Sequence, residues 1–155
     1  MTTIFDGRLF AQQKELILQG RILELKNKLK RNPKLVAVGI GNESDINLYI
    51  SMKEKIAKSL GVDFEKQVFR EDSAENEVLD WVKNKSNDNN VDGILLELPL
   101  PQKFSVGKIM EQISPQKDPD CLTAQNLGKL IYGDFTLMPA TVRVVIDILL
   151  SFWNP

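Results

Sequence analysis

The stretch from Asp92 to Pro101, DGILLELPLP, decides the fold. Its apolar run Ile94–Leu96 is typical of a strand that is buried on both faces of a parallel sheet. Pro99 and Pro101 end the strand, because proline cannot donate a hydrogen bond to a neighbouring strand. Glu97 therefore stands at the carboxyl end of a central strand, where open α/β sheets bind their ligands. It is either a satisfied structural carboxylate or part of a site, since perturbed carboxylates occur in both settings.

Helices and strands alternate along the rest of the chain. Apolar periodicity predicts helices over residues 8–31, 45–60, 73–85 and 104–113, with strands over 35–41 and 65–72. A last apolar helix follows Pro139, and residues 84–90 and 115–121 are expected to be loops. This alternation predicts an α/β fold, a three-layer sandwich with a mainly parallel sheet and helices on both faces. The last helix is apolar as far as Trp153, so we expect it to lead to a second domain or to dock on a partner.

Composition limits the possible functions. The 155 residues allow one domain with its own core, and a net charge of −1 argues against nucleic-acid binding. No stretch is apolar and long enough for a membrane span or a signal peptide, and one cysteine allows no internal disulfide, so we expect a cytoplasmic protein. The chain has no histidine, which excludes histidine-based triads and most zinc sites. Acid–base chemistry must therefore use Lys, Tyr, Asp or Glu.

Tyr49 and Lys53 are the first candidate pair for such chemistry. They are four residues apart on a predicted helix and so share one face. The simpler interpretation is an exposed helix face, because such pairs are common. The functional interpretation is an aromatic platform beside an acid–base lysine. A lysine does that work near neutral pH only when burial or another cation favours its neutral form.

The loop Lys117-Asp118-Pro119-Asp120 is the second candidate. Aspartate and proline are common in solvated turns, but Asp120 could also accept hydrogen bonds from a heterocycle with N–H donors. Cys121 lacks a histidine partner, which argues against a catalytic thiol. Gly39-Ile40-Gly41 does not match a dinucleotide fingerprint and indicates a tight strand–helix turn.

Several segments together resemble the N-terminal, folate-binding domain of the bifunctional methylenetetrahydrofolate dehydrogenase/cyclohydrolase family. The resemblance runs from Asp6-Gly7 to about Leu150. No single motif is decisive, but the order and spacing of the pieces are specific. The pieces are Val38-Gly39 through NLYISMKEK (47–55), DGILLELPLP (92–101), PQKDPDCLTAQNLGKL (115–130) and MPAT (138–141).

The resemblance implies a role for each candidate residue. Tyr49 would pack on the folate ring system, Lys53 would be the main acid–base group, and Asp120 would bind the pterin end. Glu97 would act on Lys53, and Leu98 and Pro99 would contact the substrate. Residues 1–138 would form the folate-binding catalytic domain, and residues 139–155 would form a helix that leads to a nicotinamide-binding Rossmann domain.

The same resemblance implies an activity and its partners. Family members oxidise 5,10-methylenetetrahydrofolate with NADP or NAD and hydrolyse the methenyl product to 10-formyltetrahydrofolate. The cofactor is bound mainly by the second domain, no metal is used, and the full-length enzymes are usually homodimers. The glycine-rich cofactor segment would lie beyond Pro155, so we do not expect this polypeptide alone to transfer hydride. It is either an excised domain or a naturally short paralogue.

The chain departs from the family pattern at four places. Glu97 replaces a glutamine that contacts the lysine, and a carboxylate there would favour the charged ammonium over the neutral amine. Cys121 replaces a glycine, Ile46 replaces a serine, and Pro139-Ala140-Thr141-Val142 replaces PCTP. These changes support a second interpretation, a folate-like binding or regulatory module without catalysis. A third is an unrelated α/β domain for an amino acid or nucleotide, supported by fold class alone. We expect a salt bridge between Glu97 and Lys53.

Overall fold

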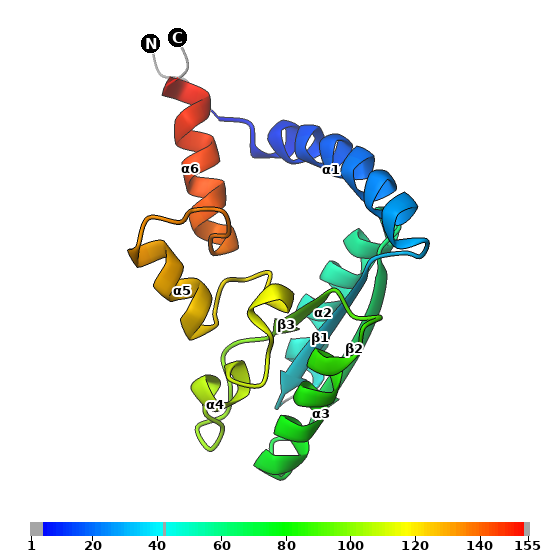
Figure 1. The fold of residues 1–155 in the computed structure, drawn as a ribbon, viewed down its shortest axis with the longest axis vertical. Coiled ribbons are helices and arrows are strands. Elements are labelled where there is room, and N and C mark those ends of the chain that lie inside the picture. Colours follow the sequence, from blue (N-terminus) through cyan, green and yellow to red (C-terminus); the bar gives the residue numbers. More distant parts are fainter. Residues whose placement is uncertain (1–4, 42, 154–155) are drawn as a thin grey trace.

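The computed structural model describes residues 5–41 and 43–153, without the side chains of Glu43, Asp45 and Trp153. Its helices and strands alternate as the sequence predicts (Figure 1). In chain order the elements are α1 (Gly7–Leu29), β1 (Lys34–Ile40), α2 (Glu43–Ser59), β2 (Asp63–Phe69), α3 (Glu75–Asn87), β3 (Gly93–Leu96), α4 (Val106–Met110), the 3₁₀ turn η1 (Pro115–Lys117), α5 (Ala124–Ile131) and α6 (Ala140–Trp153).

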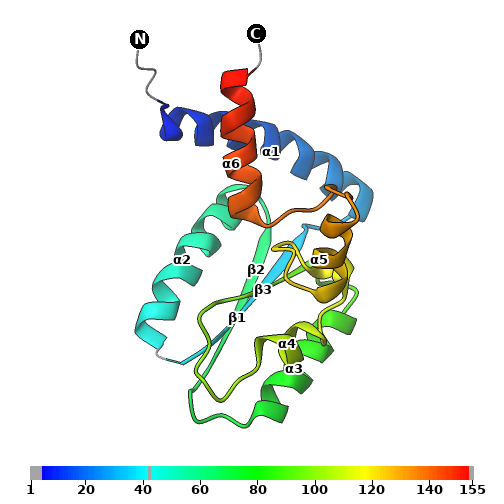
Figure 2. The ribbon, with the colours of Figure 1, turned by 90° about the vertical axis from the view of Figure 1, so that its left-hand side faces the viewer.

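The three strands form a parallel sheet in the order β2-β1-β3. Figure 2 shows α2 on one side of this sheet and α3 with α4 on the other, so the predicted three-layer α/β sandwich is confirmed. Central strand β1 alternates its side chains between the two layers. Val36, Val38 and Ile40 pack toward α3 and α4, whereas Ala37 packs with Ile50 of α2.

The ends of several elements differ from the predicted ones by a few residues. The predicted strand over 65–72 is β2, which ends at Phe69, and the helix predicted over 104–113 is only Val106–Met110. Helix α5 was not predicted. It begins after Thr123, whose hydroxyl accepts a hydrogen bond from the Asn126 backbone N–H at 3.3 Å. This is the usual start of a helix, but the short segment lies within a stretch rich in turn-forming residues.

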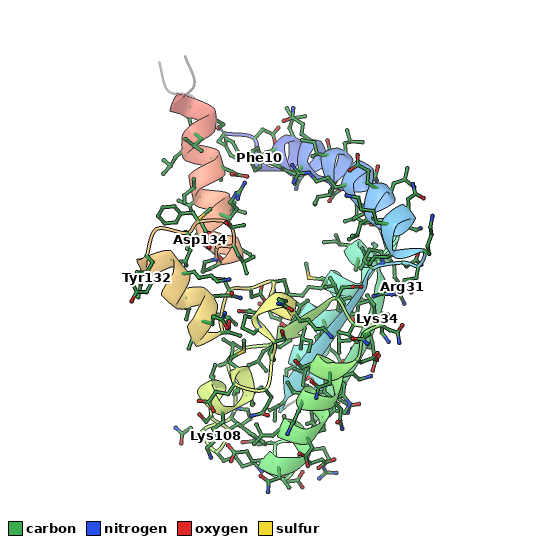
Figure 3. All side chains as sticks on the ribbon, in the orientation of Figure 1. Phe10, Arg31, Lys34, Lys108, Tyr132 and Asp134 are labelled. Carbon is green, nitrogen blue, oxygen red and sulfur yellow. The ribbon has the colours of Figure 1, made fainter. Side chains whose placement is uncertain are left out.

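Helix α1 stands away from the sheet, and none of its residues is buried (Figure 1). Its carboxyl end is fixed by Arg31, whose two terminal nitrogens donate to Asp92 at 2.6 and 2.9 Å. Asp92 also accepts the backbone N–H of Lys34 at 2.7 Å, so the start of β1 and the turn before β3 share one carboxylate. Figure 3 shows Arg31 and Lys34 at this junction.

The other end of α1 lies beside α6 (Figures 1 and 2). Lys14 forms a salt bridge with Asp147 of α6 at 2.7 Å, and the ring of Phe5 lies 5.8 Å from that of Phe152. No helix within residues 5–41 or 43–153 combines the length and apolarity that a membrane crossing requires.

Candidate active site

Glu97 is positioned by the parallel sheet. Strand β3 pairs with β1 through Leu96, which lies opposite Val38. The next backbone N–H, that of Glu97, donates to the Val38 carbonyl at 2.9 Å. The position of Glu97 is therefore fixed directly after the carboxyl end of β3. The peptide bond between the next two residues, Leu98 and Pro99, is cis.

Helix α2 brings its candidates to the same edge of the sheet. Ile50 and Ala57 are buried and fix the face of α2 that packs on the strands. Tyr49 and Lys53 lie on the neighbouring face, one helical turn apart. Tyr49 has 66% of its surface exposed, so its ring is open to a ligand.

The predicted ion pair between Lys53 and Glu97 is present. Lys53 Nζ donates to Glu97 Oε1 at 2.7 Å. The Glu97 side chain is only 11% exposed, and that of Lys53 is 42% exposed. The carboxylate is thus mostly buried and the lysine side chain about half-exposed, so solvent and salt screen the attraction between them less than in a fully exposed pair.

These residues line one pocket of about 210 Å³. Its walls are the predicted Tyr49, Lys53, Glu97, Leu98 and Pro99, together with Ile46. Two of the departures from the family pattern, Glu97 and Ile46, therefore face the same space. A charged pair lies against otherwise apolar and aromatic walls, an arrangement that fits a flat heterocycle with a few polar groups.

Asp120 lies next to this pocket but does not line it. It is half-buried, and burial raises the pKa of its carboxyl above the usual range. The charge of Lys53 acts on this pKa in the opposite direction, whereas the charges of Glu97 and Asp118 raise it further. Lys53, Glu97 and Asp120 therefore lie within electrostatic range of one another. The sequence had placed them on three separate segments.

Asp118 has a structural role that the sequence did not reveal. It is almost fully buried, and its carboxylate accepts from the backbone N–H groups of Leu122 and Thr123, the Thr123 hydroxyl and the Asn126 amide, at 2.8 to 3.0 Å. Burial acts to raise the pKa of Asp118, but these hydrogen bonds outweigh it and the pKa is lowered. The sequence signal for this role was a threonine five residues and an asparagine eight residues after the aspartate, at the start of a helix.

Cys121 is fully buried in the left-handed region, with φ of 58°. A glycine adopts this conformation at little cost, so the conformation explains why a glycine suits this position. The thiol donates weakly to the Leu137 carbonyl, with Sγ 3.8 Å from the oxygen. Burial raises the pKa of the thiol, which agrees with a non-catalytic cysteine.

Gly39–Gly41 forms a tight turn between a strand and a helix, as its sequence indicates. Gly41 follows β1 with φ of 125°, and a side-chain atom of Ile46 and one of Pro101 lie 3.6 Å from the place where its Cβ would be. The turn does not have the glycine pattern of a dinucleotide site. In the described part of the chain, no group of three or more Asp, Glu or Cys side chains is placed to hold a metal ion.

A larger hollow of about 360 Å³ lies between η1 and α5. It is lined by polar side chains that include Gln116, Gln125, Lys129 and Asp134. Among the described residues, none of the salt bridges joins two residues of its lining. The smaller pocket at Lys53 has the charged pair at its wall and is therefore the candidate active site.

Comparison with known proteins agrees with this assignment. Residues 5–120 match the family model for the tetrahydrofolate dehydrogenase/cyclohydrolase catalytic domain. The bifunctional protein FolD of Clostridium botulinum strain Eklund 17B is 41% identical over 151 residues, which are 97% of this chain and 54% of that protein. The chain thus spans about half the length of the curated relatives that it matches.

Solved structures of similar proteins share the fold. A 5,10-methylenetetrahydrofolate dehydrogenase from the silkworm Bombyx mori superposes with a TM-score of 0.90 at 30% identity, over 98% of this chain and 52% of that one. A methylenetetrahydrofolate dehydrogenase-cyclohydrolase from Trypanosoma brucei, complexed with NADP cofactor and inhibitor, has a TM-score of 0.89 at 24% identity. The match covers 99% of this chain and 52% of the Trypanosoma chain, and at 24% identity it supports the fold alone.

Proposed function

The chain belongs to the tetrahydrofolate dehydrogenase/cyclohydrolase family, and on this premise we propose that it is the folate-binding, catalytic half of such an enzyme. The reactions are the NAD(P)-dependent oxidation of 5,10-methylenetetrahydrofolate and the hydrolysis of 5,10-methenyltetrahydrofolate to 10-formyltetrahydrofolate. The observation that carries the proposal is the Lys53–Glu97 pair in a pocket walled by Tyr49.

Each pocket residue has a role in this proposal. The exposed ring of Tyr49 stacks on the pterin, and Leu98 and Pro99 form the opposite apolar wall. Asp120 accepts hydrogen bonds from the N–H donors of the ring. Lys53 moves the proton: in its neutral form it takes one from the water that attacks the methenyl carbon. Glu97 affects this step through the hydrogen bond that it accepts from Lys53 Nζ.

The nicotinamide cofactor, NADP or NAD, belongs mainly to a second domain in this proposal. It supplies the hydride acceptor for the dehydrogenase step. The FolD protein of Clostridium botulinum is about twice as long as this chain, which covers 54% of it, and this supports the division into two domains. Residues 1–138 form the folate domain, and 139–155, which include α6, form the helix toward the second domain. The full-length enzyme is a cytoplasmic homodimer, and it uses no metal.

Calorimetric titration of the intact protein with a folate analogue tests the proposal. We expect Tyr49→Ala to weaken binding by about tenfold, because it removes the stacking surface. The matched control is Tyr132→Ala, which removes the other tyrosine of the chain; it follows α5, is 93% exposed and does not line the pocket (Figure 3). If the intact protein binds no analogue, or if both variants bind it equally, the folate site is wrong.

A second candidate function is a folate-binding module without catalysis, and the Lys53–Glu97 pair is the observation that favours it. The Glu97 carboxylate binds Lys53 Nζ at 2.7 Å, so the nitrogen that the proposed chemistry needs is already held in an ion pair. The two functions differ in the effect of Glu97→Gln on methenyltetrahydrofolate hydrolysis.

We expect Glu97→Gln to raise the cyclohydrolase rate by about tenfold, because a weaker neutral hydrogen bond replaces the ionic one that holds Lys53 Nζ. Glu54→Gln is the matched control, since Glu54 lies on α2 outside the pocket lining and forms ion pairs with Lys58 of α2 and Lys66 of β2. A fully active wild-type enzyme would exclude the non-catalytic module. An inactive Glu97→Gln variant would show that the glutamate is not the cause of lost activity.

A further inference from the structure

The carboxylates around the pocket outnumber the cations. Lys53 is the one cation among the six residues of the lining, and Glu97 already bonds to it. With half-buried Asp120 beside them, the three groups sum to −1 when all are ionised. A ligand that contributes positive charge or N–H donors would balance this excess.

The free oxygens of the two carboxylates are acceptors without donors. Lys53 bonds to Oε1 of Glu97, and no other described residue donates to this carboxylate. Asp120 likewise accepts no hydrogen bond from the residues that the structure describes, although its neighbour Asp118 accepts four. Among the described residues no buried side-chain oxygen lacks a partner, so these two oxygens are accessible to solvent and available to a ligand that donates.

A glutamine at position 97 would behave differently. Its amide offers N–H donors as well as one acceptor, so it can meet a ring carbonyl or a ring amino group. The Glu97 carboxylate offers only acceptors, and its free oxygen repels the lone pairs of a ring carbonyl. Position 97 therefore determines which ring substituents the pocket accepts.

This inference rests on the proposed folate site and names the ring that the site prefers. We infer that Glu97 makes the pocket selective for donor-rich 2,4-diaminopteridines over 2-amino-4-oxopteridines. The 4-amino group supplies two N–H donors, whereas the oxo ring has an acceptor at O4 and a single N–H donor at the neighbouring ring nitrogen N3. The diamino ring also takes up a proton more readily, which would balance the negative charge of the three side chains.

Folic acid and its 4-amino-4-deoxy analogue test the inference, because they differ only in the substituent at position 4 and in the proton on the neighbouring ring nitrogen N3. Calorimetry on the intact protein at neutral pH should show the 4-amino compound binding about tenfold more tightly. Glu97→Gln should reduce this ratio to about one or reverse it, and Asp120→Asn should also lower it. Glu54→Gln, which removes an ion-paired glutamate outside the pocket, should leave the ratio unchanged.

The possible results separate the inference from the proposed function. If wild type binds both compounds equally, or if the ratio is the same in Glu97→Gln, the selectivity is wrong and the folate site stands. If neither wild type nor either pocket variant binds either compound, the folate site is wrong and the inference is wrong with it. Asp120→Asn provides the second measurement should Glu97→Gln fail to fold.

Discussion

Asp118 is the residue on which the loop before α5 depends. Four hydrogen bonds converge on its buried carboxylate, two of them from backbone N–H groups. Removal of the carboxylate would leave those donors without acceptors in a place that water does not reach. Since Asp120 lies two residues further on, the same bonds also fix the half-buried carboxylate beside the pocket.

We expect Asp118→Asn to lower the free energy of unfolding by about 3 kcal/mol at neutral pH, because an amide cannot accept all four bonds. The pKa of Asp118 is lowered in the folded state, so its contribution is fully present above the unfolded pKa of about 3.9 and is lost as pH falls through the folded value. Urea unfolding of wild type and variant from pH 7 to pH 2 should show their difference shrinking with acid. Asp80→Asn, at an exposed aspartate of α3, is the control. A difference that does not vary with pH would contradict this account.

At the residue scale the main prediction was confirmed because a family resemblance supplied it. The resemblance predicted contact between position 97 and Lys53, whereas the sequence pattern alone placed Glu97 at a strand end and Lys53 on a helix face with Tyr49. The sequence is typical of a solvated turn at Asp118, because the backbone N–H groups that bind its carboxylate reach it only when the loop has folded. The sequence alone does not distinguish a buried, hydrogen-bonded aspartate from an aspartate in an open loop.

The contact between β1 and α2 is the element-scale feature that places Lys53. Gly39 of β1 lies directly under Ile46 of α2, and a Cβ built on Gly39 would come within 2.5 Å of Ile46 Cγ2. Ile46 is β-branched and has few rotamers in a helix, so it cannot swing aside. The close approach of strand and helix therefore requires a residue without a side chain at position 39.

We expect Gly39→Ala to destabilise the protein by about 2 kcal/mol, because the added methyl group forces α2 away from the sheet. Addition of Ile46→Ala should recover part of this loss, and a double-mutant cycle from urea unfolding measures the coupling. Gly20→Ala is the opposite control, since nothing lies within 4 Å of its Cβ position on α1, and it should stabilise by about 0.5 kcal/mol or more. Additive effects of Gly39→Ala and Ile46→Ala would show that the two residues do not compete for space.

At the element scale the strong periodic segments were predictable and the short ones were not. The three strands and the longer helices follow from β-branched runs and apolar spacing, and their ends shift by one to three residues. The eight residues of α5 were missed because Gly128 and the preceding turn formers obscure the apolar spacing of Leu127, Leu130 and Ile131. The apolar stripe of α1 predicts a helix correctly, but which surface the stripe faces depends on tertiary packing.

Across the whole molecule, packing is uneven. The sheet and its flanking helices contain the core, whereas α1 and α6 present large exposed apolar side chains. On α1 these are Leu9, Leu16, Ile17, Leu18, Leu23 and Leu25, and on α6 they include Val142, Val144, Val145, Leu149, Leu150 and Phe152. Exposed apolar surface of this extent is typical of a face that another domain covers. It supports the proposed second domain.

We expect this unevenness to appear in hydrogen exchange of the chain 1–155. Amides of α1 should exchange by local opening, because no side chain of that helix is buried. Amides of β1, a central strand with five buried residues, should exchange only on global unfolding. Helix α3, whose Val78 and Val82 are buried, is the matched control and should be well protected. Equal protection of α1 and α3 would show that α1 is stabilised by contacts beyond those described.

The reactivity of Cys121 can report how often the loop around it opens. It is the single thiol of the chain and has no exposed surface, so an alkylating reagent reaches it only after the surrounding loop has moved. The rate of modification in native buffer thus measures how often that loop opens, with no introduced label. Because Asp120 is the adjacent residue, a ligand that orders Asp120 should slow the labelling. Occupancy of the pocket then becomes readable by mass spectrometry of the unaltered protein.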